Sequence, residues 1–87
     1  MSLTFNAARA LRDGGIDACA ALDSALARML AELPSEHHAE VKLAMARTLA
    51  AVMDETINKA VAAFAELSPD EETWREVVKS QAMKRAM

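Results

Sequence analysis

The feature that most constrains the fold is a stretch of 32 residues, 36–67, that contains neither glycine nor proline. Ser35 precedes it as a reasonable N-cap. Large apolar residues recur along it every three or four positions, which is the spacing of one side of a helix. They are Val41, Met45, Leu49, Val52, Ile57, Ala60, Phe64 and Leu67. Glu40, Arg47 and Asp54 repeat every seven residues on the other side. The pattern predicts one long helix over 36–67, typical of bundles and coiled coils.

Two helices are predicted before it. The first covers 4–13, begins at Thr4 as N-cap, and ends at Gly14–Gly15, because glycine readily closes a helix. The second covers 16–33 and ends before Pro34. Its apolar stripe has helical spacing and comprises Cys19, Leu22, Leu26, Met29, Leu30 and Leu33.

A fourth helix is predicted over 69–85. Ser68 is a suitable N-cap, Pro69 occupies the first helical position, and Glu71 is placed to return a hydrogen bond to the cap. Trp74 lies near the start of this helix, and we expect it to anchor the helix on 36–67.

Composition agrees with an all-α fold. Twenty of the 87 residues are alanine, whereas aromatic residues make up only 3% of the chain, and there are two glycines and two prolines. A chain of 87 residues is one domain, 1–87, with a thin core. We therefore predict a small antiparallel bundle of three to four helices built on one long central helix.

The long helix outreaches its neighbours. Thirty-two residues span about 48 Å as a helix, whereas a compact globule of this chain length is about 31 Å across. Helices 16–33 and 69–85 are each half as long, so part of the apolar side stays uncovered. An exposed apolar face marks an interface, and a two-fold dimer is its commonest solution. We therefore expect a homodimer. The predicted interface residues are Leu43, Met45, Leu49, Met53, Ile57, Val61 and Phe64.

A rival interpretation breaks the long helix near 54–58. Two shorter helices would then fold into a compact monomeric bundle, and the reason for an oligomer would disappear.

The candidate metal ligands are His37 and Glu40, which lie three residues apart in a helix and can therefore meet. The order His-x-x-Glu differs from the Glu-x-x-His of di-iron bundles, and no second helix carries a matching pair. A solvated first turn is the favoured interpretation, so we predict no metal and no cofactor. Cys19 lies in an apolar stripe, where a thiol is packing material, and no catalytic residues are predicted.

These observations favour a non-enzymatic protein that acts by protein–protein association, as a scaffold, adaptor or regulatory subunit. A nucleic-acid-associated regulator is the alternative, but the net charge is −3 and the ten basic residues are dispersed, so we do not expect nucleic acid as a partner. A metal-binding protein that uses His37 and Glu40 is a further alternative. The lone cysteine and the lack of a long uncharged apolar run predict a cytoplasmic protein without a membrane partner.

Overall fold

The computed structural model describes residues 2–86 and is all-α, as predicted. No strand occurs within this range. Two short 3₁₀ turns, Ser35–His37 and Ala65–Leu67, connect the helices. The helices are α1 (Phe5–Glu32), α2 (His38–Glu55), α3 (Ile57–Ala63) and α4 (Glu71–Ala86).

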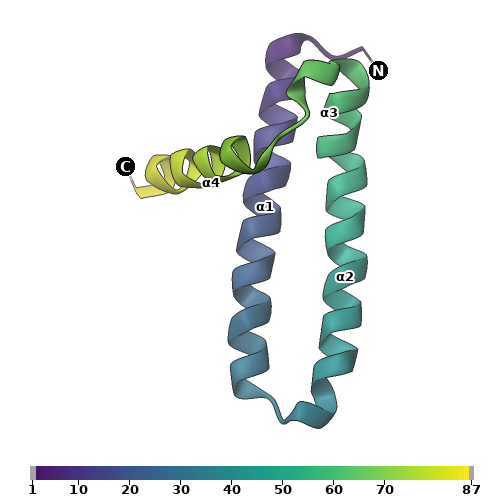
Figure 1. The fold of residues 1–87 in the computed structure, drawn as a ribbon, viewed down its shortest axis with the longest axis vertical. Coiled ribbons are helices and arrows are strands. Elements are labelled where there is room, and N and C mark those ends of the chain that lie inside the picture. The colour runs from purple at the N-terminus through teal and green to yellow at the C-terminus, as the bar shows by residue number, and fades with distance from the viewer. Residues whose placement is uncertain (1, 87) are drawn as a thin grey trace.

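The long axis of the molecule is an antiparallel hairpin of α1 and α2, with α3 continuing α2 (Figure 1). The closing turn is held by the backbone N–H of Leu33, which donates to Met29 O at 3.1 Å, and by His38 Nε2, which donates to Leu33 O at 2.9 Å. The molecule extends 45 × 30 × 21 Å. It is therefore longer than a compact globule of the same chain length.

The prediction of two helices separated at Gly14–Gly15 is wrong, because α1 runs unbroken through both glycines. Thr4 is the N-cap as predicted, since its hydroxyl accepts a hydrogen bond from the N–H of Ala7 at 3.1 Å. Neither glycine has a positive φ, so neither adopts the conformation that ends a helix. Gly15 is instead buried where α1 meets Thr56.

The prediction of one long helix over 36–67 also needs correction. The helix begins at His38 rather than after Ser35, bends at Thr56 and ends at Ala63. At the bend Thr56 has φ −119° and ψ −78°, and its hydroxyl donates to Val52 O at 2.5 Å. Backbone N–H groups of Thr56 and Ala60 still bond four residues back, so α2 and α3 form one bent helix. The bend lies within the 54–58 segment of the rival interpretation. However, α3 continues the direction of α2, so the two parts do not form separate helices that fold against each other (Figure 1).

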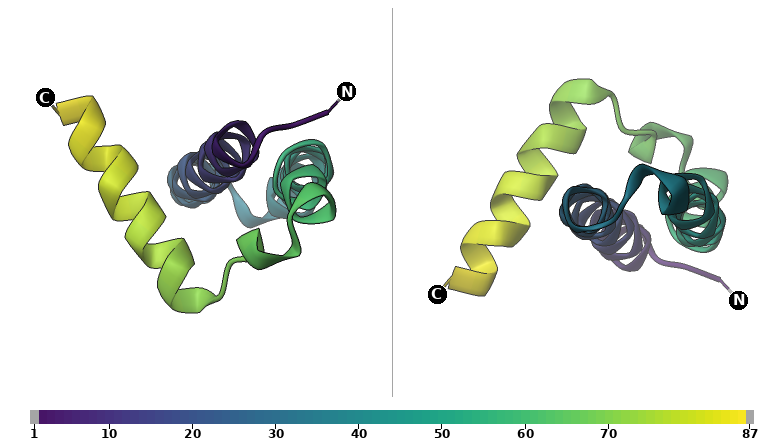
Figure 2. Two further views of the ribbon diagram at one scale, coloured as in Figure 1. Left: turned by 90° about the horizontal axis from the view of Figure 1, so that it is seen from above. Right: turned by 90° about the horizontal axis from the view of Figure 1, so that it is seen from below.

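The start and the course of α4 differ from the prediction as well. Asp70, not Ser68, caps the helix, because its carboxylate accepts a hydrogen bond from the N–H of Thr73 at 2.7 Å. Ser68 ends the preceding 3₁₀ turn with φ −58° and ψ 115°, and so belongs to the connection. Figure 2 shows that α4 does not lie along α3 but crosses beside α1.

The core lies at the open end of the hairpin, where α1, α3 and α4 meet. One cluster contains Ala8, Ala60 and Leu67, and the aromatic rings of Phe5 and Phe64 meet edge to face with centroids 5.3 Å apart beside it. The other cluster contains Ile16, Ile57 and Val77, with Val61, Trp74 and Val78 packed against them. Trp74 therefore anchors α4 on α1 as well as on α3.

Candidate functional site

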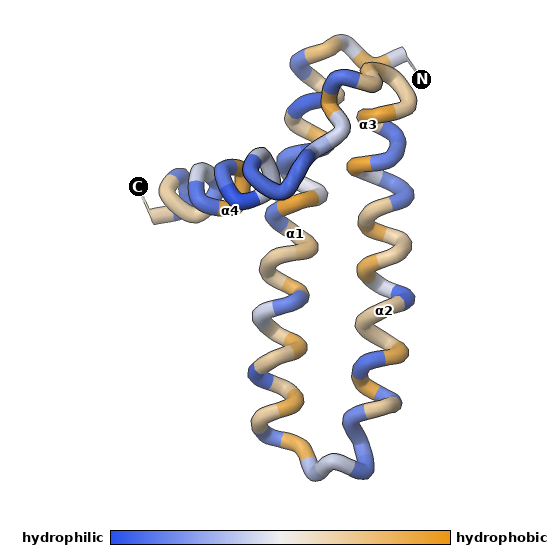
Figure 3. The backbone as a smooth tube through the Cα atoms, viewed as in Figure 1, coloured by the Kyte–Doolittle hydropathy of each residue, from blue (hydrophilic) through white to orange (hydrophobic). Residues whose placement is uncertain are grey.

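A groove runs along the half of the hairpin that is farther from this core. Its volume is about 420 Å³, and we call it the hairpin groove. It is lined by Leu22, Met29, Leu33, His37, Glu40, Val41, Ala44, Met45 and Thr48. The helical spacing of both arms explains the groove, because side chains three or four residues apart line the same side of a helix. Figure 3 shows that hydrophobic positions continue along both arms down to the turn.

The apolar side chains of this half of the hairpin are at most half-buried in the single chain. No residue of α2 is buried, although the helix has 18 residues. Met29 is 41% exposed and Leu43 is 54% exposed, whereas Ile16 in the core is 0% exposed. Two helices side by side cover only one stripe of each other, so both flanks of the pair stay in contact with water.

The seven predicted interface residues are distributed between core and surface. Ile57 is only 4% exposed and lies in the core, with Val61 packed against the same cluster. Phe64 packs against the cluster of Ala8, Ala60 and Leu67. Of the remaining four, Met45 lines the hairpin groove and Leu49 is half-buried, while Leu43 and Met53 are exposed.

Sequence reasoning did not assign Leu22, Met29 and Leu33 to a candidate surface. The spacing of their stripe predicts only that it covers part of the long helix. The signal that could have identified them is the width of the stripe, because a helix in a two-helix layer contacts its neighbour along only part of its apolar side.

The two histidines of the candidate metal cluster have different environments. His38 closes the turn through Leu33 O, and His37 lies at the rim of the groove with Nε2 3.8 Å from Glu36 Oε1. Glu40 also lines the groove. Among residues 2–86, no group of three or more histidine, cysteine, aspartate or glutamate side chains is placed to hold a metal ion.

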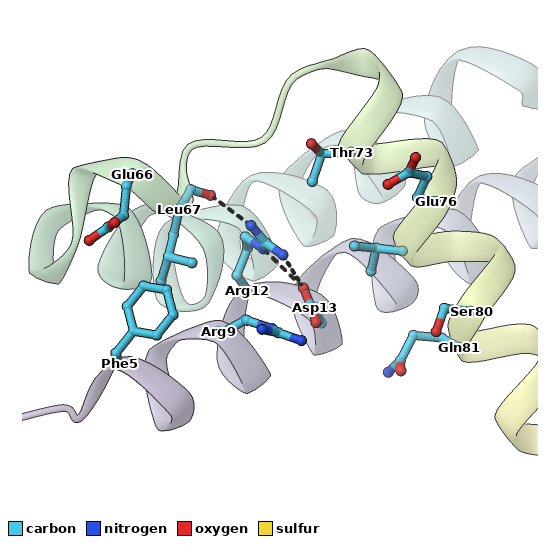
Figure 4. Close-up of a pocket in the computed structure, with 11 residues that line it drawn as sticks. Phe5, Arg9, Arg12, Asp13, Glu66, Leu67, Thr73, Glu76, Ser80 and Gln81 are labelled. Carbon is cyan, nitrogen blue, oxygen red and sulfur yellow. Dashed lines mark hydrogen bonds and ion pairs between the residues drawn. The ribbon is translucent and has the colours of Figure 1, made fainter.

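A second hollow of about 420 Å³ lies between α1 and α4 (Figure 4). Arg12 crosses it: Nε donates to Asp13 Oδ1 at 2.9 Å, Nη2 lies 2.8 Å from the same oxygen, and Nη1 donates to Leu67 O at 3.4 Å. The guanidinium is thus neutralised by its neighbour and joins α1 to the segment that precedes α4. We interpret this arrangement as a structural clamp.

Cys19 is buried in α1, as its place in the apolar stripe predicted. Burial raises the pKa of the thiol because it disfavours the charged thiolate, and the negative charge of Asp23 raises the pKa further. Few thiolates are therefore present at neutral pH, and it is the thiolate that acts as nucleophile.

Across residues 2–86, none of the helices combines the length and the apolar character needed to cross a membrane. No known protein family, curated protein or solved structure matches the chain.

Proposed function

We propose that the protein is a non-enzymatic association module and that it binds a second copy of itself through the face of the hairpin that carries the hairpin groove. One observation carries the proposal: an 18-residue amphipathic helix, α2, has no buried residue in the single chain. Helices in proteins owe most of their stability to packing of an apolar face, and an exposed apolar face marks an interface.

The position of α4 leaves this surface accessible. On α1, Asp13 lines the hollow beside α4, and Asp17 forms an ion pair with Arg85 of α4. Leu22, in the hairpin groove, follows Asp13 by about two and a half helical turns and so lies on the opposite side of α1. Figure 2 likewise shows α4 on one side of the hairpin. A second copy can approach the groove without displacing α4.

The dimensions of the hairpin fit a stable dimer. The hairpin lies along the 45 Å axis of the molecule and is two helices wide. With about 10 Å per helix, two such faces would cover a footprint on the order of 900 Å² per copy, close to the roughly 800 Å² that standard interfaces bury on each side. Alanine and threonine in the groove allow close approach, and methionine adapts its shape to the opposing surface.

Sedimentation equilibrium at micromolar concentration tests the proposal. We expect twice the 9.4 kDa chain mass for the natural sequence. Met29→Glu places a charge in the groove at an exposed position and should yield monomers with unchanged helix content. Met83→Glu is the matched control, because Met83 is 60% exposed on α4 and away from the groove, and it should remain dimeric. A monomeric natural protein would refute the proposal.

The proposal includes a cytoplasmic location. Cys19 is unpaired and buried, which suits a reducing compartment.

A further inference from the structure

We infer that the two copies pack hairpin face against hairpin face, with the hairpin groove of each on the open end of the other and the closing turns at opposite ends of the dimer. The inference rests on the proposed self-association and adds its orientation. Two hairpins that meet face to face about a two-fold axis have two simple arrangements: the turns lie together at one end, or they lie apart.

The charge of the turn opposes the arrangement with turns together. Residues 30–41 contain Glu32, Glu36 and Glu40 and no lysine or arginine. All three glutamates are exposed, and Glu40 lines the groove itself. Turns placed together would gather six carboxylates at one end of the dimer, and the two Glu40 side chains would face each other across the interface, where like charges repel at separations up to the screening length of about 8–10 Å.

The open end of the hairpin offers complementary surroundings. Residues 56–65 contain Lys59 and no acidic residue. Lys59 lines a hollow with Leu3, Ala62 and Ala63. It forms an ion pair with Glu55 on the same helix, and both side chains are exposed, so the lysine remains accessible to a further carboxylate.

The lengths of the helices bring these groups together. In the arrangement with turns apart, the bent helix of 38–63 lies antiparallel on its own copy. A symmetric overlap sets the beginning of α2 beside the partner copy's α3, which places Glu40 of one copy near Lys59 of the other. The acidic turn of each hairpin then meets the open end of its partner.

Distances between spin labels distinguish the two arrangements. Cys19→Ala removes the natural thiol, and Ser35→Cys provides a labelling position in the exposed turn. With the turns apart, double electron–electron resonance should give a label separation close to the 45 Å length of the molecule. With the turns together, the separation would be about 20 Å, the width of two helices.

A second labelling position provides the matched control. Ala63 is exposed at the open end, so mixing Ala63→Cys and Ser35→Cys chains should produce a short distance between unlike labels. A short distance in the Ser35→Cys homodimer would overturn the orientation while leaving the dimer intact. Absence of any dipolar coupling together with a monomer mass would overturn the proposed function, and the orientation with it.

Discussion

At the residue scale, Gly15 determines how closely α1 can approach the bent helix. A Cβ atom at Gly15 would lie 2.0 Å from Thr56 Oγ1 and 2.7 Å from Thr56 Cβ. Both distances are below any van der Waals contact, so Gly15→Ala must push the helices apart or force Thr56 into a poor rotamer. Overpacking of this kind costs about 1–3 kcal/mol, and we expect the free energy of unfolding in urea to fall by that amount.

The neighbouring glycine supplies the control. A Cβ atom at Gly14 meets nothing within 4 Å, and the backbone there is helical. Gly14→Ala should therefore raise the free energy of unfolding by up to about 1 kcal/mol, the difference in helix propensity. Equal effects of the two substitutions would show that Gly15 is not a contact point.

The two glycines also show which structural roles can be predicted from local sequence. Thr4 as N-cap and Cys19 as a packed thiol follow from local spacing alone. The dipeptide Gly14–Gly15 suits a helix end as well as a close helix crossing, and only the position of Thr56, 41 residues further along the chain, distinguishes the two. Local sequence does not contain that information.

At the element scale, Asp70 controls the start of α4 through its charge. The N–H of Thr73 donates to its carboxylate, which lowers the pKa of Asp70 below the ordinary 3.8. The folded state thus prefers the ionised form. Its contribution to stability is complete above the unfolded pKa and is lost as the pH falls through the lower folded value.

We expect Asp70→Asn to keep the cap but to lose this acid dependence, because an amide oxygen accepts the same hydrogen bond without titrating. Asp70→Ala should lose the cap and melt at lower temperature at neutral pH. Thermal melts between about pH 2 and pH 6, followed by Trp74 fluorescence, compare the three proteins. A natural protein and an Asp70→Asn variant with identical acid profiles would contradict the assignment.

The long helix shows where element-scale prediction ends. Apolar spacing predicted most of 38–63 correctly, because burial of one side determines the period. The rival interpretation of a break near 54–58 includes the bend, but no glycine or proline identifies Thr56 as its position. The segment after Ala63 kept an apolar pattern, but Phe64 is extended and Leu67 folds back over Ala8 and Ala60. Tertiary packing decided the helix end.

At the scale of the whole molecule, the candidate site was predicted only in part. The length of the predicted helix, compared with that of its neighbours, was enough to predict surplus apolar surface. Which residues remain exposed depends on where α4 packs. Because α4 crosses α1 through Val77 and Trp74, Ile57 became core and Met29 stayed exposed.

A dimer that covers this surface links stability to concentration. Dissociation accompanies unfolding, so the Tm of the natural protein should fall by roughly 3–5 °C for each tenfold dilution, as expected for a cooperative unit of two chains. The exposed variant Met29→Glu should melt at one temperature at all concentrations, while Met83→Glu should follow the natural protein. Differential scanning calorimetry over a hundredfold concentration range gives the comparison. A natural protein whose Tm ignores dilution would mean that the hairpin is stable with its groove uncovered, and that the core of Ile16, Ile57 and Val77 alone suffices to hold the helices together.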